Sequence, residues 1–417
     1  MSHAAFAPFQ GLPQAESDII FALTSRFQSA QKCFSAGSLT LKPFNLGIGK
    51  FVDDNGRTPL MSSVRKALQF SFEQRAGEKI SGGYLPILGC TEYIRALEEL
   101  VFGEIEVARL RSEGIVSGCQ TLGGTGACFV QAFFLKKLGV QEIALSNPTW
   151  GNHKKIYSMA GLRLNEYGYY DYKTSTLTFD SMIGGLERCA AGSAVSLHAC
   201  CHNPTGADPS REQWERIVQV LKERQLIAVF DAAYAGFAKD LPTDLFSIRE
   251  CVKQGVPTLV AFSFSKIASL YEERLGGCLV ALPKGCGEHT RVESALESVQ
   301  RPSISNPPAI VGRAMGHLLT STELRSEWEG ELAADAKQIQ HGGELIASAL
   351  DRLGVAHGGV NLRNGMFAIL PFSTSQVEQL EREQQVYMLP DGRINVAAIK
   401  DSNVEEISSR IAKVVKA

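Results

Sequence analysis

The sequence of 417 residues lacks long hydrophobic runs and a strong net charge, and each absence argues against a class of function. No apolar run approaches the roughly 18 residues that a bilayer-spanning helix needs. The formal net charge of -2 produces no overall field that would attract nucleic acid or an anionic membrane. We therefore expect no nucleic-acid partner and no membrane association.

The sequence also lacks the signals of export. Residues 1–25 contain neither lysine nor arginine but include Glu16 and Asp18, so we expect neither a signal peptide nor an arginine-rich transit peptide. The ten cysteines form no Cys-X-X-Cys pair, and several lie in apolar runs, as buried reduced thiols do. A reducing compartment, the cytoplasm, is the expected location.

The composition and length predict two domains. With 44% hydrophobic and 21% charged residues the chain resembles ordinary globular proteins, and it is longer than one core usually supports. Strand and helix signals alternate through its middle, which predicts a mostly parallel sheet flanked by helices. We expect an α/β fold with a large domain at residues 59–333. A smaller α+β domain would combine residues 18–58 and 334–417, after an N-terminal arm at residues 1–17.

Three helix signals are specific enough to test. Asp208 and Pro209 predict the start of a helix, with proline at its first position. Residues 322–353 predict a long helix that bridges the two domains. Ser402 and Glu405 predict a capping box at the start of the closing helix.

Lys266 follows an apolar run and is surrounded by small and apolar residues. Burial disfavours the charged form of a lysine, lowers its pKa and makes the amine a nucleophile or proton carrier. Ser263, Ser265 and Arg274 would supply hydroxyls and a guanidinium beside it. This combination favours a phosphate-bearing carbonyl cofactor, pyridoxal phosphate. The alternative is a lysine that ends a strand and extends into water.

A glycine-rich segment, Gly123-Gly124-Thr125-Gly126, precedes an apolar helical stretch. Such a loop presents free N–H groups and the positive end of a helix dipole to an anion. A dinucleotide site is the alternative, although Phe129 stands where the third glycine of that motif belongs.

Asp231 follows a buried apolar strand, where a carboxylate needs a cationic partner. A protonated pyridine nitrogen would be such a partner, and a helix N-cap is the alternative reading. In a parallel sheet, ligands bind at the carboxyl ends of the strands, and Trp150, Asp231 and Lys266 all fall there.

Four candidate metal ligands occur between His198 and His202. Strand alternation would place His198, Cys200 and His202 on one face. Structural zinc sites usually need a second cluster, and the sequence contains none, so we expect no metal.

Seven ordered motifs resemble the aspartate/aromatic aminotransferases, which are class I, fold-type I pyridoxal-phosphate enzymes. They are Ser146 to His153, Cys201 to Gly206 (with Asn203-Pro204-Thr205-Gly206), Asp231 to Phe237, Ser263 to Gly276, Ser305 to Pro308, Asn364 to Phe367 and Gly392 to Val396. The resemblance runs from about residue 17 to the C-terminus.

The resemblance implies a role for each residue around the cofactor ring. Lys266 would hold the cofactor covalently and later carry the substrate proton, while Asp231 would keep the pyridine nitrogen protonated. Tyr234 and Asn203 would hydrogen-bond the phenolic oxygen, and Trp150 would cover the ring. His153 and His198 would support Asp231 on the side away from the cofactor. The phosphate would be held by Gly124, Thr125, Ser263, Ser265, Arg274 and Tyr84 of the partner subunit.

The resemblance further implies a homodimer with shared active sites and a dicarboxylate substrate. Arg393 would bind the α-carboxylate and Arg301 of the partner subunit the distal one, because a planar guanidinium matches a carboxylate bidentately. Gly49, together with Trp150 and Asn203, would complete the substrate site. The expected reaction converts L-aspartate and 2-oxoglutarate to oxaloacetate and L-glutamate by ping-pong transamination.

Three departures from the family pattern bear on the substrate. Lys50 replaces a small or apolar residue, Val52 stands where aspartate-specific members often carry lysine, and Gly83 precedes Tyr84 where a larger residue is usual. A broad-specificity aromatic aminotransferase is therefore the alternative. A cofactor-bound but catalytically silent protein, or a β-lyase or decarboxylase, are alternatives of other classes.

Overall fold

The computed structural model describes residues 12–14, 18–53, 56–80, 82–286 and 289–416. The predicted N-terminal arm, residues 1–17, lies almost wholly outside these ranges. No helix within the described residues is long and apolar enough to cross a membrane.

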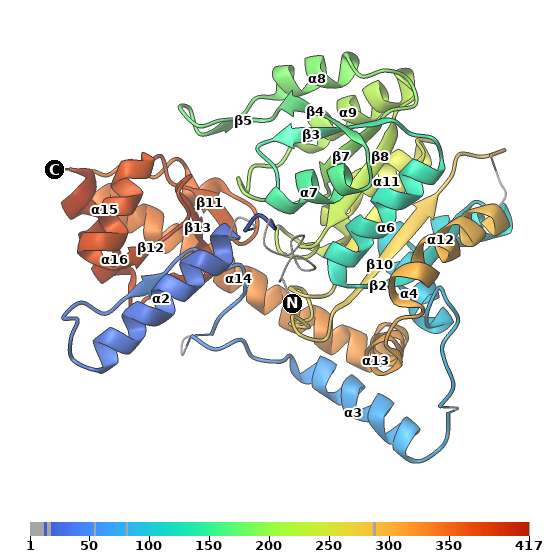
Figure 1. The fold of residues 1–417 in the computed structure, drawn as a ribbon, viewed down its shortest axis with the longest axis horizontal. Coiled ribbons are helices and arrows are strands. Elements are labelled where there is room, and N and C mark those ends of the chain that lie inside the picture. The colour runs from blue at the N-terminus through green and yellow to red at the C-terminus, as the bar shows by residue number, and fades with distance from the viewer. Residues whose placement is uncertain (1–11, 15–17, 54–55, 81, 287–288, 417) are drawn as a thin grey trace, which may run out of the picture.

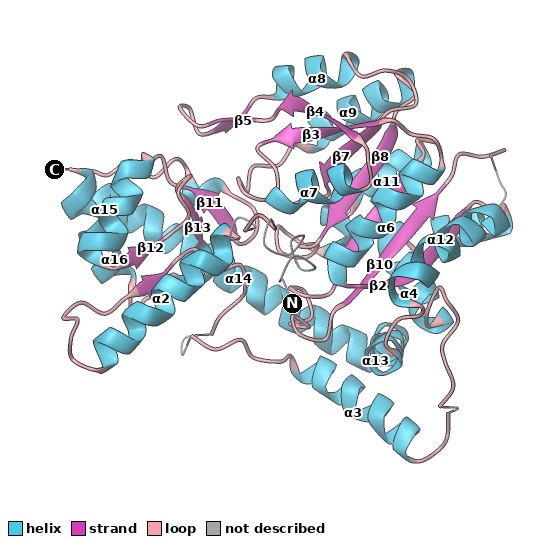
Figure 2. Cartoon of the chain, viewed as in Figure 1, coloured by secondary structure: helices cyan, strands magenta, loops and turns pink. Residues whose placement is uncertain are grey.

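A seven-stranded sheet forms the centre of the larger lobe, in the order β2-β10-β9-β8-β7-β3-β4 (Figure 2). The strands from β9 to β4 pair in parallel, whereas β10 is antiparallel to both of its neighbours. The α/β prediction with a mostly parallel sheet is thereby confirmed. The strands are β2 (Val116–Leu122), β3 (Glu142–Asn147), β4 (Arg163–Gly168), β7 (Ala194–His198), β8 (Ile227–Ala232), β9 (Thr258–Ser263) and β10 (Leu275–Ala281).

Helices cover both faces of this sheet, and successive strand residues therefore contribute to different cores. Val229 and Leu259 belong to one apolar cluster, while the adjacent Phe230 and Val260 belong to the other. The helices of this lobe are α3 (Ser62–Ala76), α4 (Thr91–Phe102), α5 (Glu104–Ser112), α6 (Gly123–Lys137), α7 (Gly151–Met159), α8 (Phe179–Glu187), α9 (Arg211–Glu223), α10 (Leu241–Asp244), α11 (Phe246–Lys253), α12 (His289–Ile304) and α13 (Ala309–Thr320). A small hairpin, β5 (Tyr170–Asp171) with β6 (Thr176–Leu177), extends from it.

The smaller lobe joins the two ends of the chain. Strand β1 (Phe44–Asn45) pairs with β12 (Val386–Tyr387), and β11 (Phe367–Ile369) pairs with β13 (Arg393–Asn395). The lobe also contains α2 (Ile19–Ser35), α15 (Thr374–Gln384) and α16 (Val404–Val415). The long helix α14 (Thr322–Arg352) runs from one lobe to the other, as predicted (Figure 1). The residue boundaries of the two domains remain a prediction.

Two predicted helix starts are wrong. Helix α9 begins at Arg211 with a capping box formed by Ser210 and Gln213. Asp208 instead accepts hydrogen bonds from the backbone N–H groups of Cys201 and His202 at 2.7 and 2.9 Å. The tertiary fold brings these donors to the carboxylate, which spacing along the sequence does not reveal.

The capping box predicted at Ser402 and Glu405 is also absent. Asn403 occupies the N-cap of α16, and its side chain makes no capping hydrogen bond to that helix. Its Oδ1 accepts from the N–H of Lys400 at 2.9 Å, and its Nδ2 donates to the carbonyl of Ala398 at 3.0 Å. The Asn403 side chain therefore stabilises the turn before the helix and does not cap the helix.

Candidate active site

A pocket of ≈ 130 Å³ lies at the carboxyl ends of the parallel strands. It contains most residues that the sequence singled out, brought together from segments more than 200 residues apart in the chain. Its lining consists of Gly49, Gly124, Thr125, Trp150, Asn203, Asp231, Ala233, Tyr234, Ser263, Ser265, Lys266, Tyr271 and Arg274.

Lys266 lies in a turn directly after β9, with its Nζ 5.3 Å from the centre of the Tyr234 ring. The turn is anchored from α14, because Trp328 Nε1 donates to the Ile267 carbonyl at 2.7 Å. Burial lowers the pKa of Lys266, Asp231 opposes this shift and Arg274 adds to it. The amine is thus easier to deprotonate than an exposed lysine, as the sequence predicted.

The start of α6 and the end of β9 form a compact anion cradle. Arg274 Nη1 donates to Ser265 Oγ at 3.1 Å, and the N–H of Ser265 donates to Ser263 Oγ at 3.3 Å. A Cβ at Gly123 would lie 2.6 Å from Arg274 Nη2, and one at Gly124 would lie 2.9 Å from Ser263 Cβ. Only glycines leave room for these groups beside the N–H groups at the start of the helix.

Asp231 lies within β8 and not at a helix N-cap, so the alternative reading of this residue is wrong. Its Oδ2 is 3.1 Å from His153 Nε2, and His153 Nδ1 is 2.9 Å from Thr149 Oγ1. Burial raises the pKa of Asp231, but the hydrogen bond from His153 and the positive charge of Lys266 oppose it, and the net shift is downward. Asp231 is therefore a carboxylate that faces the pocket.

His198 stands behind this pair. Its ring centre is 5.2 Å from that of His153, and its Nε2 is buried without a hydrogen-bond partner among the described residues. Burial, with the nearby His202 and His153, lowers the pKa of His198 well below its usual range. Neutral His198 therefore supports His153 by packing.

Arg393 lies beside the pocket and is almost fully buried, at 4% exposure. Its Nη1 donates to Asn203 Oδ1 at 3.1 Å, its Nη2 approaches the Gly47 carbonyl at 3.5 Å, and its guanidinium lies 4.3 Å from the centre of the Phe367 ring. Its Nε has no hydrogen-bond partner among the described residues. A buried guanidinium with an unsatisfied donor is suited to bind a carboxylate.

Tyr84 and Arg301 do not line the pocket. Tyr84 is 95% exposed, and the exposed Arg301 on α12 donates to Ser305 Oγ at 2.5 Å. Both residues lie on one edge of the larger lobe, because residues near Arg301 contact the loop that follows Tyr84. Asn306 Nδ2 donates to the Leu85 carbonyl at 3.1 Å, and Gln300 Nε2 donates to the Ile87 carbonyl at 2.8 Å.

Tyr271 is the pocket residue that sequence reasoning missed. Its hydroxyl accepts from the N–H of Phe51 at 2.8 Å, and burial raises its pKa. The residue stands five positions after Lys266 in the same motif, but its contact with residue 51 is tertiary.

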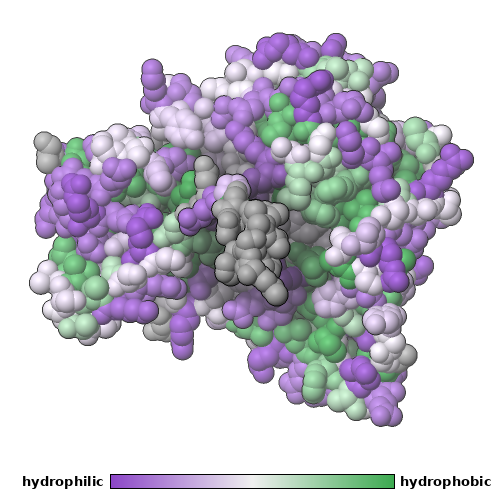
Figure 3. All heavy atoms as spheres, in the orientation of Figure 1, coloured by the Kyte–Doolittle hydropathy of each residue, from purple (hydrophilic) through white to green (hydrophobic). Residues whose placement is uncertain are grey.

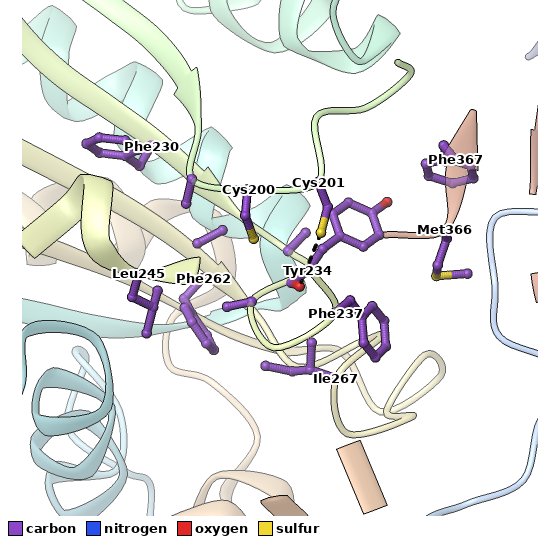
Figure 4. Close-up of a cluster of buried hydrophobic side chains, with 14 of the residues drawn as sticks. Cys200, Cys201, Phe230, Tyr234, Phe237, Leu245, Phe262, Ile267, Met366 and Phe367 are labelled. Atoms are coloured by element: carbon purple, nitrogen blue, oxygen red, sulfur yellow. Dashed lines mark hydrogen bonds between the residues drawn. The ribbon is translucent and has the colours of Figure 1, made fainter. Parts of the chain in front are cut away.

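The predicted strand alternation through His198, Cys200 and His202 is wrong, because β7 ends at His198. Figure 4 shows Cys200 and Cys201 within an apolar cluster with Phe230, Tyr234 and Phe262. His202 is used for hydrogen bonding, with Ser146 Oγ 3.0 Å from Nε2 and Thr205 Oγ1 2.8 Å from Nδ1. These residues therefore serve packing and turn formation.

Comparisons with known proteins agree with this geometry. The family model of aminotransferase class I and II matches residues 42–411. The chain is 36% identical to aspartate aminotransferase of Escherichia coli (strain K12), covering 98% of this chain and 100% of that protein. It is 38% identical to the mitochondrial aspartate aminotransferase of Gallus gallus, covering 90% and 88%.

Solved structures include members of both substrate branches. The cytoplasmic aspartate aminotransferase of Saccharomyces cerevisiae superposes with a TM-score of 0.91 at 30% identity, covering 99% of each chain. An aromatic-amino-acid aminotransferase of Burkholderia pseudomallei, covalently bound to pyridoxal phosphate, superposes with a TM-score of 0.90 at 34% identity, covering 100% of each chain.

Proposed function

Because the chain belongs to the aminotransferase class I and II family, we propose that it is a pyridoxal-phosphate-dependent aspartate aminotransferase. It converts L-aspartate and 2-oxoglutarate to oxaloacetate and L-glutamate by ping-pong transamination. The observation that carries the proposal is the pocket in which Lys266, Asp231 and Tyr234 meet an anion cradle, with the unsatisfied Nε of Arg393 beside it.

The residues of the pocket fit the cofactor. The cradle of Gly124, Thr125, Ser263, Ser265 and Arg274 would hold its phosphate, since hydroxyls, a guanidinium and free helix N–H groups all favour an anion. The Asp231 carboxylate would hold a protonated ring nitrogen. The bound cofactor supplies an electron sink for the bonds of the substrate Cα.

Each pocket residue has a task in the transfer. Lys266 would anchor the cofactor through Nζ, and its lowered pKa lets the free amine take the proton from the substrate Cα and return it. His153 holds the Asp231 carboxylate in place by a hydrogen bond of 3.1 Å. Asn203 and Tyr234 would bind the phenolic oxygen, and Trp150 would cover the ring.

Substrate recognition needs two cations that are free to bind carboxylates. Among the described residues, Arg393 beside the pocket can serve as one, while Arg274 belongs to the phosphate cradle and Lys266 would anchor the cofactor. We propose that a homodimer supplies Tyr84 and Arg301 from the partner subunit, since these two residues share one edge. The exposed Phe70 and Phe72 of α3 support an interface there, where Figure 3 shows apolar surface near α13 and α3. A cavity of ≈ 680 Å³, partly lined by Phe70, lies on the same side. We propose the cytoplasm as the location, in keeping with free cysteines that are buried except Cys33 and Cys286.

A second candidate is broad or aromatic specificity, since aromatic aminotransferases are also among the similar structures. Lys50 and Val52 favour it, because they change the polarity of the segment around Gly49, which lines the pocket.

One kinetic experiment tests these proposals. Purified wild type is assayed with aspartate, glutamate, phenylalanine and tyrosine as donors and with 2-oxoglutarate as acceptor. Oxaloacetate is the expected product from aspartate. Alanine and carbon dioxide would indicate a decarboxylase, ammonia released without an amino acceptor would indicate a lyase, and no turnover of any donor would indicate a silent protein. Lys266→Ala should lose both turnover and the visible absorption band of the covalently held cofactor, and a variant that retained the band would contradict the anchoring role.

The substrate range is tested with Arg301→Asp. Losing a buried charge pair to the distal carboxylate should reduce kcat/KM for aspartate about 100-fold, and that for phenylalanine far less. Equal losses for the two donors would refute the role of Arg301.

A further inference from the structure

The segment of residues 46–52, here called the strap, carries Gly49 to the pocket. It contains no helix or strand, yet Leu46, Phe51 and Val52 are buried at 1, 2 and 8% exposure. Because the strap has no regular ladder of its own, its backbone polar groups need partners elsewhere.

The partners of five strap carbonyls come from one short segment that begins with Arg393. Side chains and backbone of residues 393–400 donate to five carbonyls of the strap. The bonds are Asn395 N to Leu46 O at 2.6 Å, Arg393 Nη2 to Gly47 O at 3.5 Å, Asn395 Nδ2 to Ile48 O and to Lys50 O at 2.8 Å each, and Lys400 Nζ to Val52 O at 2.9 Å. The segment that presents the unsatisfied guanidinium of Arg393 thus also fixes the strap.

The opposite side of the strap is attached to the cofactor pocket. The N–H of Phe51 donates to the hydroxyl of Tyr271, and the Tyr271 carbonyl accepts from Arg274 Nη1 at 3.1 Å. The strap therefore lies between the residues that would bind the cofactor phosphate and the arginine suited to bind a carboxylate.

Lys400 is the unusual member of this arrangement because it is a cation at 7% exposure. Burying an ammonium costs free energy unless it is paired. The groups that offset this cost include the Val52 carbonyl, the Phe51 ring at 5.5 Å from Nζ, and the nearby carboxyl of Asp335 on α14. Two of these groups belong to the strap itself.

We propose that Lys400 is a positioning residue for the substrate, which acts through Val52 and Phe51 to hold Gly49 at a fixed place relative to Arg393. This inference rests on the proposed function and adds a determinant of substrate binding outside the pocket. Gly49 and Arg393 would bind the same small substrate, so a shift of the strap misplaces one group relative to the other and weakens substrate binding. The charge of Lys400 matters because a neutral residue offers the Val52 carbonyl a weaker donor or none.

The test compares Lys400→Met, which removes the ammonium but keeps a long apolar side chain, with Lys400→Arg, which can still donate to the Val52 carbonyl. Lys413→Met on the exposed face of α16 is the matched control. Amide hydrogen exchange is measured on a peptide that covers residues 46–53 in each cofactor-loaded variant without substrate, and KM and kcat are measured for aspartate.

In Lys400→Met we expect exchange of the strap peptide to rise about tenfold, because a hydrogen bond to a charged group is worth about 1.5 kcal/mol. KM for aspartate should rise about tenfold with kcat changed far less, Lys400→Arg should restore both values, and Lys413→Met should match the wild type. If Lys400→Met does not fold, Lys400→Gln replaces it and should show the same changes to a smaller extent.

Two results would overturn the inference. One is an unchanged strap peptide with unchanged KM in the neutral variant. The other is faster exchange that extends equally to peptides from β8 and α6, which would show a general loss of stability. A wild type that does not turn over aspartate would refute the proposed function, while the exchange data would still decide whether Lys400 holds the strap.

Discussion

Replacing Gly124 by alanine should weaken cofactor binding by crowding. The φ of Gly124 lies outside the left-handed region, so alanine suits its backbone and only the added Cβ matters. That Cβ would lie 2.9 Å from Ser263 Cβ and 3.3 Å from Ser263 Oγ. Ser263 cannot move away easily, because it is 2% exposed and pairs with Gly276 at the end of β9.

The size of the effect follows from this contact. Overpacking of a rigid site costs about 1–3 kcal/mol, and a glycine replaced in a helix returns about 0.5–1 kcal/mol, so the net loss of stability is about 1 kcal/mol. Displacing Ser263 Oγ would remove the proposed hydrogen bond to the phosphate, worth about 1.5–3 kcal/mol, which corresponds to a roughly ten- to hundredfold weaker affinity for pyridoxal phosphate.

The assay is titration of the cofactor-free protein with pyridoxal phosphate, followed by its visible absorption, together with thermal melting with and without cofactor. A tenfold loss of affinity at saturating cofactor should remove about 1.4 kcal/mol of the stabilisation that the ligand provides.

Gly330→Ala is the matched control, because this exposed glycine of α14 has nothing within 4 Å of an added Cβ and should gain about 0.5–1 kcal/mol. The reasoning would be refuted if Gly124→Ala bound cofactor within twofold of the wild type and the two alanine variants shifted the melting temperature in the same direction.

Two further predictions concern α14. Burial and the charge of Glu331 raise the pKa of Asp335 to about 7, while Lys400 opposes the shift. Protonated Asp335 therefore favours the folded state, and this stabilisation is complete below the unfolded pKa of about 4 and is lost as the pH rises through 7. Asp335→Asn cannot ionise and should gain about 3 kcal/mol relative to the wild type as the pH rises from roughly 5 to 8 in urea unfolding, whereas parallel pH profiles would contradict this. Trp328→Phe leaves the buried Ile267 carbonyl without its donor and should lower the free energy of unfolding by about 2–3 kcal/mol. Urea unfolding measures this loss, and a value below roughly 0.5 kcal/mol would show that the hydrogen bond from Trp328 does not anchor the turn.

Local patterns were sufficient for the alternation of strands and helices that gives the parallel part of the sheet. Buried β-rich runs such as Thr258–Ser263 alternate with helical segments, and this alternation implies parallel strands whatever the distant partners are. Helix starts were less predictable. At Asp208 the decisive partners are backbone groups in a neighbouring turn, and these compete with the capping role that spacing suggests. The N-cap of α16 falls on Asn403, one residue after the predicted Ser402, and its side chain also bonds to a backbone group of the preceding turn.

The sequence by itself determined the α/β architecture, the family and the chemical identity of the pocket, because Lys266, Asp231 and Asn203 each belong to a short local motif at the end of a strand. Only the tertiary structure decided that Tyr271 and Lys400 meet the strap at residues 51 and 52. The physical reason is that these contacts join segments 220 and 348 residues apart in the chain. Their geometry depends on how two lobes and a sheet pack, and residue spacing carries no information about that packing.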